Sequence, residues 1–256
     1  MFLVDTHAHL DLSIFDHDIY EVIQRSCTLG IQKICIPNIN STSFLDINIL
    51  CNNFHNICFP MIGLHPTSIN TFYKNDLRII RKELNKRKYI AIGEIGIDYF
   101  KNKIYAKEQI KAFEEQLHWS IEFDLPIVIH AREAFLEVFE SLYKIGLNKL
   151  CGVFHSFNGN LENLKEILKY KNFMFGVNGL ITHKNNEFQK HLYIVPIEKI
   201  LLETDSPYLT PIPFRGRRNE PSYIIHIAQK IATIYNMPVE IIAKITTCNA
   251  LNLFKI

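Results

Sequence analysis

Short apolar runs alternate along this chain with longer segments in which apolar and polar residues follow a helical period. The runs, rich in β-branched and aromatic residues, cover residues 1–7, 32–38, 57–65, 89–96, 125–131, 150–156, 173–179 and 199–205. Continuous apolar runs of this length are typical of strands that are covered on both faces, as in a parallel sheet. Their spacing leaves room for one helix after each strand.

The segments between the runs predict amphipathic helices. Apolar residues recur three and four positions apart in residues 106–123, and the same spacing occurs in residues 43–54, 74–86, 132–146 and 160–170. Gly30 and Gly146 stand where the C-caps of helices are expected. Residues 221–254 predict two closing helices, with Pro238 near the start of the second.

A strand followed by a helix, repeated eight times, predicts a (β/α)8 barrel of the TIM type, within the α/β class. A doubly wound open sheet shows the same alternation, but its usual G-x-G-x-x-G loop is absent after the early runs. The run at 57–65 predicts the weakest strand, because Pro60 cannot donate to a ladder. Since no long linker or low-complexity tract interrupts the pattern, we expect one domain over residues 1–256.

Composition and charge add only broad limits. Hydrophobic residues make up 48% and charged residues 21%, which is ordinary for a soluble globular protein. The net charge of +2 is too small to predict binding to nucleic acid or to a membrane from overall charge. The N-terminal residues lack the features of a signal peptide, and no run has the length of a membrane span. Six scattered cysteines without a C-x-x-C pair argue against a disulfide framework or a zinc knuckle. We therefore expect a cytoplasmic protein with no membrane association and no obligate protein partner.

Imidazole and carboxylate side chains stand at the ends of six of the predicted strands. They are His7, His9, His65, Glu94, His130, His155 and Asp205. In a barrel these strand ends converge on one mouth, where the active sites of this fold lie. His7 and His9 are two residues apart, so on a strand both side chains point the same way. Any one of these residues could be an ordinary hydrogen-bonding side chain, but their joint pattern indicates a site.

The donor types suit divalent transition metals, and they favour Zn, Mn or Fe over Mg in affinity without deciding the native metal. One catalytic zinc takes about three protein ligands, whereas two ions can clamp the attacking and leaving oxygens of a displacement. Two ions suit the six candidate ligands His7, His9, Glu94, His130, His155 and Asp205. We expect Glu94 to bridge the ions and Asp205 to act as general base toward an activated water. Simpler roles as capping residues remain open for Glu94 and Asp205.

Residues 202–223 follow the eighth run, where barrel enzymes often bind phosphate. Forked guanidinium donors suit phosphate oxygens, and this segment contains Arg215, Arg217 and Arg218. Arg132, two residues after His130, can reach the same mouth. The alternatives are a solvated basic loop and, for Arg132, the start of a surface helix. Three aromatic residues on loops at the mouth are candidates for stacking on bases: Tyr99, Phe100 and Tyr208.

Seven motifs, taken in order, resemble the TatD family of metal-dependent hydrolases, within the amidohydrolase-like barrels. They are DTHAHLD (5–11), GLHP (63–66), GEIGIDY (93–99), HAREA (130–134), HSFNG (155–159), ETDSPYL (203–209) and RGRRNEP (215–221). The resemblance extends from residue 4 to the end of the chain. It implies one ion held by His7, His9, Glu94 and Asp205, and a second ion held by Glu94, His130 and His155. It also implies nuclease activity, typically on DNA and often from a 3′ end, with His65 beside the scissile phosphate.

One departure from the family is His183, where an aromatic residue is usual, and it leaves the substrate preference open. The leading hypothesis is a metal-dependent phosphodiesterase that acts on DNA ends, with RNA as a second substrate. The alternative is an amide or ester hydrolase of small molecules. Such barrels often bridge their metals with a modified lysine, so Glu94 and the arginine-rich eighth loop favour the phosphodiesterase. A non-catalytic binding barrel is disfavoured by the intact ligand set. Asp5 and Asp11 could orient the histidines or simply be polar residues at a strand end.

Overall fold

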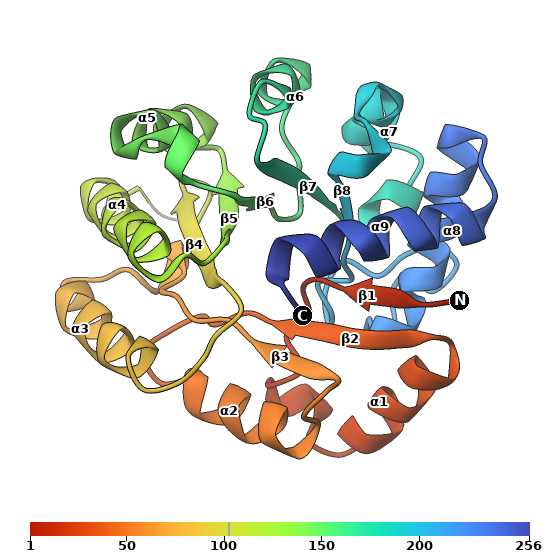
Figure 1. Cartoon of the computed structure of the whole chain (residues 1–256), viewed down its shortest axis with the longest axis horizontal. Coiled ribbons are helices and arrows are strands. Elements are labelled where there is room, and N and C mark those ends of the chain that lie inside the picture. Colours follow the sequence, from red (N-terminus) through yellow and green to blue (C-terminus); the bar gives the residue numbers. More distant parts are fainter. Residues whose placement is uncertain (102) are drawn as a thin grey trace.

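The computed structural model describes residues 1–101 and 103–256, and within them eight strands alternate with helices (Figure 1). The strands are β1 (Leu3–Asp5), β2 (Ile31–Ile36), β3 (Cys58–Pro60), β4 (Ile92–Asp98), β5 (Ile127–Arg132), β6 (Gly152–Phe154), β7 (Phe173–Val177) and β8 (Ile200–Leu202). Each of the eight apolar runs overlaps one of them. Strands β1 to β3 form one parallel sheet and β4 to β8 form another, each in sequence order.

Hydrogen bonds continue across both seams between the two sheets. Ile62 forms a parallel bridge with Ile92 at the β3–β4 seam, and Ala8 forms one with Ser206 at the β8–β1 seam. Within the described residues these short bridges replace a ladder, and the strands are arranged in a ring with helices outside it (Figure 1). The predicted (β/α)8 fold is confirmed. Pro60 ends β3, but β3 is no shorter than β1, β6 and β8, so the prediction that it is the weakest strand stays a prediction.

The α-helices pack around the ring. They are α1 (Ile19–Thr28), α2 (Phe44–Asn53), α3 (Tyr73–Leu84), α4 (Ala106–Phe123), α5 (Phe135–Ile145), α6 (Leu161–Leu168), α7 (Glu187–His191), α8 (Ile224–Tyr235) and α9 (Val239–Phe254). Short 3-10 helices are η1 (Ser13–Phe15), η2 (Pro66–Ser68), η3 (Leu147–Lys149), η4 (Gly179–Thr182), η5 (Leu192–Ile194), η6 (Ile197–Lys199) and η7 (Pro221–Tyr223). Helix α4 coincides with the helix predicted over 106–123. Gly146 ends α5 with a φ of 111°, the left-handed conformation expected of a glycine C-cap.

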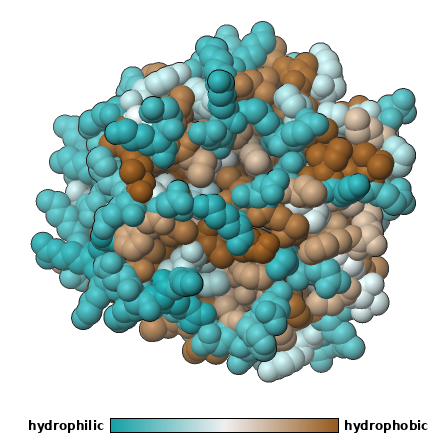
Figure 2. All heavy atoms as spheres, in the orientation of Figure 1, coloured by the Kyte–Doolittle hydropathy of each residue, from teal (hydrophilic) through white to brown (hydrophobic). Residues whose placement is uncertain are grey.

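Helix α9 covers the end of the ring at which the strands begin (Figure 1). A compact apolar layer fills the ring there and packs against the helix; its members are Val4, Cys35, Met61, Ala91, Val128, Val153 and Leu201 from the strands and their flanks, with Ala250, Leu253 and Phe254 from α9. Figure 2 shows this face, with apolar residues near its centre and hydrophilic residues around the rim. Among the described helices, none has the length and apolarity needed to cross a bilayer.

The apolar layer determines which strand residues point into the ring at its opposite end. Because side chains two residues apart on a strand point the same way, the inward position after Val128 is His130. By the same rule Val153 is followed by His155, and Leu201 by Glu203. Packing at one end therefore determines which side chains reach the mouth at the other.

Candidate metal centre

The structure brings the predicted histidines and carboxylates together at the C-terminal ends of the strands. Each of the five histidines His7, His9, His65, His130 and His155 has a ring nitrogen within 4.0 Å of a carboxylate oxygen of Glu94 or Asp205. Of these two acidic side chains, Asp205 is the more exposed, at 13%, and Glu94 is buried. The cluster therefore lies in a deep, mostly enclosed part of the mouth.

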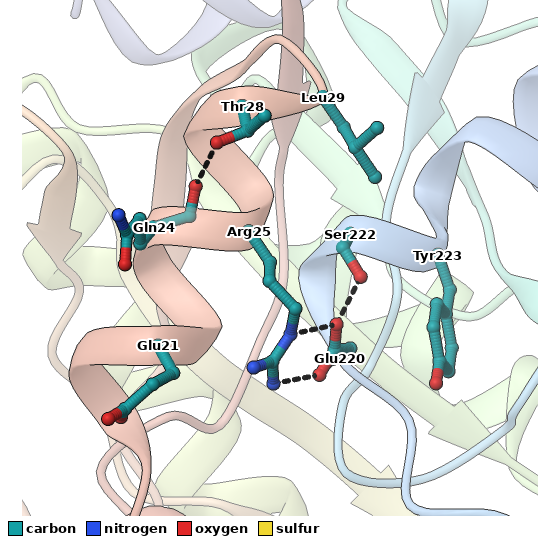
Figure 3. Close-up of a pocket in the computed structure, with 8 residues that line it drawn as sticks. All are labelled: Glu21, Gln24, Arg25, Thr28, Leu29, Glu220, Ser222 and Tyr223. Carbon is teal, nitrogen blue, oxygen red and sulfur yellow. Dashed lines mark hydrogen bonds and ion pairs between the residues drawn. The ribbon is translucent and has the colours of Figure 1, made fainter.

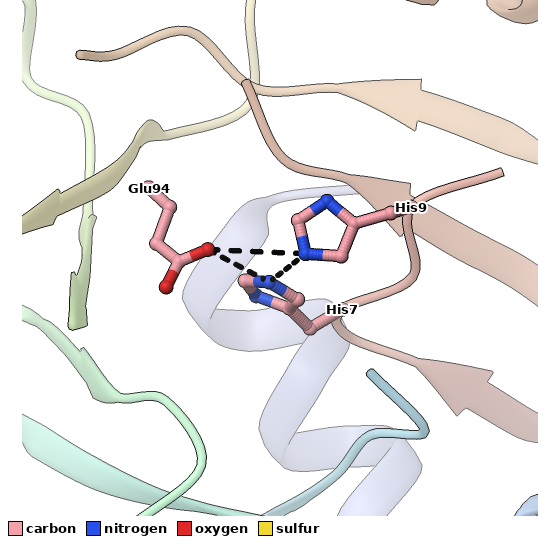
Figure 4. Close-up of side chains that lie close together, drawn as sticks. All are labelled: His7, His9 and Glu94. Atoms are coloured by element: carbon pink, nitrogen blue, oxygen red, sulfur yellow. Dashed lines mark hydrogen bonds and ion pairs between the residues drawn. The ribbon is translucent and has the colours of Figure 1, made fainter. Parts of the chain in front are cut away.

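His7 and His9 follow β1 and turn their Nε2 atoms toward each other, 3.3 Å apart (Figure 4). Oε2 of Glu94 lies 3.1 Å from Nε2 of His7, and Oδ1 of Asp205 lies 3.4 Å from Nε2 of His9. Nδ1 of His7 is buried and has no hydrogen-bond partner among the described residues. Two imidazole nitrogens this close, facing carboxylate oxygens, form a natural set of donors for a cation.

Glu94 lies at the centre of the cluster, and its two oxygens face different histidines. Oε2 faces the pair formed by His7 and His9. Oε1 lies near three ring nitrogens: 2.8 Å from His130 Nδ1, 3.4 Å from His65 Nε2 and 3.7 Å from His155 Nε2. One carboxylate thus separates two groups of nitrogen donors, which is the position required of a bridging ligand.

Asp98, at the end of β4, holds the far side of the His130 ring. Its Oδ2 lies 2.9 Å from Nε2 of His130, and its Oδ1 accepts the backbone N–H of Lys101. With Nε2 engaged in this way, Nδ1 is the nitrogen that faces Glu94. Asp98 was not among the site residues predicted from the sequence. A usable signal was its position four residues after Glu94 on the same strand, which places both side chains on one face.

Glu203 lies at ion-pair distance from His155. Its Oε1 lies 3.2 Å from Nδ1 of His155 and accepts the backbone N–H of Ser156 at 2.6 Å. A Cβ atom at Gly176 would lie 2.2 Å from Oε2 of Glu203, so glycine at this position makes room for the carboxylate. Glu203 was also missed from the sequence, although it stands directly after β8 and two residues before Asp205.

The β8–β1 seam fixes the backbone that carries Asp205. The amide of Asp205 donates to the carbonyl of His7 at 2.8 Å, and Asp205 has a φ of 56°. A non-glycine residue rarely adopts this left-handed conformation, and such residues cluster at functional sites. Asp5 also joins the seam, since its Oδ1 accepts the amides of His7 and Thr204 and its Oδ2 accepts the Thr204 hydroxyl. Asp5 therefore links the two strand ends through the backbone and does not contact the imidazoles.

Burial and charge act in opposite directions on these groups. Burial alone would raise the pKa of Glu94, but the surrounding imidazoles hold it well below its usual range. The pKa of Asp205 is lowered for the same reason, against burial, by His9, His155 and His7. Burial would lower the pKa of His130, yet Asp98 and Glu94 raise it to about 9. Glu203 and Glu94 likewise raise the pKa of His155 to about 10. The carboxylates are therefore ionised at neutral pH.

His65 is oriented by the 3-10 helix η2, which it caps. Its Nδ1 accepts the backbone N–H of Thr67 at 3.1 Å, so the neutral ring carries its proton on Nε2. Burial lowers the pKa of His65 and favours this neutral form. Nε2 lies 3.3 Å from Nδ1 of His130 and 3.4 Å from Oε1 of Glu94. His65 therefore presents an N–H group to the cluster.

The arrangement fits divalent cations. Among the described residues, three groups could each hold an ion: His7 with His9 and Glu94, His65 with Glu94 and His130, and His7 with His155 and Glu203. In each group the donor atoms lie within 4.8 Å of one another. Their imidazole and carboxylate chemistry, together with the unpartnered Nδ1 of His7, meets what a borderline divalent metal requires.

The loop after β8 is anchored to α1 by two ion pairs. Arg218 binds both carboxylate oxygens of Asp18, at 2.8 and 2.5 Å. Arg25 binds both oxygens of Glu220, at 3.1 and 2.7 Å, in a surface pocket between α1 and η7 (Figure 3). The guanidinium of Arg218, predicted to bind phosphate, is thus already occupied by a carboxylate.

The tip of this loop carries the two remaining arginines. Arg215 and Arg217 are exposed, and within the part of the chain that the structure describes neither forms an ion pair. Arg217 approaches the ring of Phe214, with 5.8 Å between its guanidinium carbon and the ring centre. Arg218 and Glu220 thus anchor the loop, and the guanidinium groups of Arg215 and Arg217 remain without an ion-pair partner among the described residues.

The other predicted binding residues also lie around the mouth. Arg132 ends β5, and its guanidinium stacks on the ring of Phe100. The ring of Tyr208 lies 6.0 Å from the ring of His9, edge to face, and Tyr208 is 53% exposed. Tyr99 is only partly exposed, and it packs against the core.

Two residues left open by the sequence have different surroundings. Asp11 lines a cavity of about 540 Å³ between the β1–α1 loop and α2, and its Oδ1 is buried without a hydrogen-bond partner among the described residues. His183, the departure from the family pattern, has its Nε2 3.0 Å from the carbonyl of Thr210. It therefore ties the loop after β7 to the loop after β8.

The sequence profile of the TatD-related DNases matches residues 4–255. The chain belongs to the TatD-related DNase family. It is 36% identical to the uncharacterized metal-dependent hydrolase YabD of Bacillus subtilis, over 99% of both chains. It is 30% identical to the 3′-5′ ssDNA/RNA exonuclease TatD of Pantoea ananatis, over 98% of this chain and 99% of that protein.

A solved structure places this TatD-family chain among known folds. The crystal structure of YjjV, a TatD homologue from Escherichia coli, superposes with a TM-score of 0.92 and 27% identity. The match covers 99% of this chain and 98% of YjjV. The family and its relatives, together with the groups of metal donors, identify the chain as a metal-dependent hydrolase of the TatD family.

Proposed function

We propose that this TatD-family hydrolase is a nuclease that cleaves phosphodiester bonds of DNA from the 3′ end, with RNA as a second substrate. The position of Glu94 carries the proposal, because its two carboxylate oxygens face two different groups of imidazoles. The name of the Pantoea ananatis relative supports the substrate class. Residues 1–256 act as one catalytic domain in this proposal, and the free cysteines agree with a cytoplasmic location.

Two divalent cations per chain, Zn, Mn or Mg, are part of the proposal. His7, His9, Glu94 and Asp205 would hold one ion, and Glu94, His130 and His155 would hold the other. When bound, such ions polarise a phosphoryl oxygen and lower the pKa of a water molecule. Asp98 and Glu203 would keep the rings of His130 and His155 in the orientation that this requires.

Asp205 would accept the proton of the attacking water. Its carboxylate is ionised, because the imidazoles around it lower its pKa. It is also the more exposed of the two central carboxylates, so a water molecule can approach it from the mouth. General-base transfer by a group placed in this way typically contributes a factor of about 10² to 10⁴ in rate.

His65 would act on the substrate through its Nε2–H. The amide of Thr67 fixes the tautomer, so this N–H points toward Glu94 and His130. A donor at this position can bind an oxygen of the scissile phosphate and stabilise the charge that develops on it. Its lowered pKa keeps the ring neutral and its donor in place near pH 7.

The arginines would bind the phosphates that flank the reacting one. Arg215 and Arg217 have free, exposed guanidinium groups on the loop after β8, and Arg132 lies at the end of β5. Arg218 is paired with Asp18. This contact supports a role in anchoring the loop and not in binding phosphate. These arginines would make the mouth locally positive, although the net charge of the chain is small.

Hydrolysis of an end-labelled oligonucleotide by Glu94→Gln and Asp205→Asn tests the proposal. Both variants should lose activity by at least about a hundredfold, since even outer positions around a metal change activity by 10 to 100-fold. Glu140→Gln, on the exposed side of α5, is a matched control and should keep full activity. Product lengths from 3′- and 5′-labelled strands give the direction of digestion.

Three outcomes would contradict the proposal. The first is full activity in either purified variant. The second is faster turnover by the wild-type protein of a panel of amides and lactones than of any oligonucleotide, which would favour the small-molecule hydrolase. The third is metal analysis that finds no bound ion, with no activity after addition of Mn²⁺, Zn²⁺ or Mg²⁺.

A further inference from the structure

Phe100 and Arg132 form a stacked pair on the lip of the mouth. The guanidinium carbon of Arg132 lies 3.7 Å from the centre of the Phe100 ring. Phe100 is nevertheless 55% exposed, so the arginine covers one part of the ring and leaves the rest open to solvent. The backbone fixes the pair, because the amide of Tyr99 donates to the carbonyl of Arg132 at 2.9 Å.

The pair is connected to the candidate metal centre through Asp98. In the β4–β5 ladder Asp98 is the partner of Arg132, and its carboxylate binds the ring of His130. The charge of Arg132 also contributes to the lowered pKa of Asp98. Arg132 is two residues beyond His130, about 7 Å along the strand and on the same side. The stacked pair therefore lies next to the residue that holds His130, at the edge of the candidate metal centre.

Several exposed apolar side chains lie on the loops that surround this mouth. They follow β1, β3, β4 and β8, and they are Ile14, Phe72, Phe100, Ile104, Tyr208 and Ile212. Among these, Phe100 is an aromatic ring that also carries a guanidinium on one face. Flat apolar surface beside a cation matches a nucleotide, which offers a flat base and an anionic phosphate.

We propose that Phe100 and Arg132 form a platform for one unpaired nucleobase beside the scissile phosphate. The base stacks on the open surface of Phe100, and the guanidinium of Arg132 binds the adjacent phosphate. Stacking does not depend on base identity, since every base has a flat face. A base within a duplex has both faces covered by its neighbours, so the platform selects unpaired ends. This inference rests on the proposed nuclease function.

A single abasic site moved along a single-stranded oligonucleotide tests the platform. For the wild-type protein, kcat/KM should fall about tenfold when the missing base is at one position next to the cut, in line with the usual contribution of base stacking. Phe100→Ala should lose about tenfold on the intact strand and should lose nothing more at that abasic position. Phe100→Trp should keep both the rate and the sensitivity to the missing base.

Two controls separate stacking from a general structural effect. Bis(p-nitrophenyl) phosphate has no nucleobase, so the ratio of oligonucleotide to bis(p-nitrophenyl) phosphate turnover should fall about tenfold in Phe100→Ala. Tyr193→Ala removes an exposed aromatic ring from η5, away from the loops of the mouth, and should leave this ratio unchanged. Equal losses on both substrates in Phe100→Ala, or an abasic effect that persists in that variant, would overturn the platform.

Binding gives a readout that does not depend on hydrolysis. Fluorescence anisotropy of a labelled single strand with the metal-free protein should show weaker binding for Phe100→Ala, about tenfold, and the same loss for wild type with the abasic strand. If no substrate is hydrolysed but this base-dependent binding is present, the proposed nuclease function fails and the platform stands. If wild type and Phe100→Ala bind both strands equally, the platform is wrong whatever the activity.

Discussion

Nδ1 of His130 lies 2.8 Å from Oε1 of Glu94, the shortest contact between this carboxylate and a histidine among the described residues. The opposite nitrogen of the same ring is held by Asp98 at 2.9 Å. Because Asp98 holds Nε2, Nδ1 is the nitrogen of His130 that can face a cation beside Glu94. The direction of Nδ1 is therefore set by Asp98. The orientation of His130 is therefore determined by a residue that need not touch the metal.

Asp98→Asn should weaken metal binding and activity by about 10 to 100-fold while the fold survives, because the amide holds His130 less firmly. Raising the metal concentration should restore part of the activity, which is the signature of a positioning role. Metal titrations followed by activity and by circular dichroism measure both effects. An Asp98→Asn protein with wild-type affinity for every metal would show that the contact with His130 has no orienting role.

Metal affinity should rise with pH. In the metal-free protein the pKa of His130 is about 9 and that of His155 about 10, so both rings are protonated near neutrality. A bound ion must displace these protons. Calorimetric titrations at pH 7 in two buffers of different ionisation enthalpy should therefore detect proton release. A dissociation constant that is unchanged between pH 6 and pH 9 would contradict this.

The same rings affect the stability of the metal-free protein. Their folded-state pKa values lie above the ordinary value of 6.5. Their stabilisation is therefore complete below about pH 6.5 and is lost as the pH rises through 9 and 10. With a chelator present, the melting temperature should fall across this window, and the metal-loaded protein should show a smaller fall.

Thr204→Val should destabilise the fold by about 1 to 3 kcal/mol, because it leaves Oδ2 of Asp5 buried without its hydroxyl donor. Thr28→Val, an exposed substitution on α1, is the matched control and should change stability by less than about 0.5 kcal/mol. Urea unfolding curves of Thr204→Val, Asp5→Asn and the double variant give the coupling between the two residues. Additive losses in the double variant would show that the contact contributes little.

The arginines of the loop after β8 should separate into two classes. Arg215→Ala and Arg217→Ala together should reduce the salt dependence of oligonucleotide binding by about two phosphate contacts and leave stability unchanged. Arg218→Ala should instead lower stability by about 1 kcal/mol, since it releases Asp18. Binding measured between 50 and 200 mM salt, beside urea unfolding, checks both. A lower salt dependence in Arg218→Ala would support the sequence prediction that this residue binds phosphate.

The pattern of the sequence predicted the eight strands in order, because burial on both faces of a parallel strand produces continuous apolar runs. It did not predict where each strand ends: β3 ends at Pro60 and β8 at Leu202, before the runs at 57–65 and 199–205 end. Val128 and Val153 fix the inward phase, so the positions of His130 and His155 follow from spacing alone. The helix at 106–123 was predicted with its bounds, since its apolar period is long. The predicted helix at 132–146 begins at Phe135, because Arg132 still belongs to β5 and Glu133 has a positive φ.

Partners that come from distant parts of the chain could not be predicted. Asp98 and Glu203 carry the same spacing signal as the metal donors, but an acidic residue at a strand end is common, and only the geometry shows the rings that they hold. Arg218 looked like a phosphate ligand because its sequence neighbours are basic. Its carboxylate partner, Asp18, lies at the start of α1, and no local pattern connects the two.

The β8–β1 seam also has a consequence for how the protein is made. His7 is synthesised well before Asp205, whose amide holds the carbonyl of His7. Contacts between such distant segments form slowly and only after most of the chain exists. A growing chain without the segment around Asp205 therefore carries an incomplete set of candidate metal donors, and the site is complete only once β8 has joined β1.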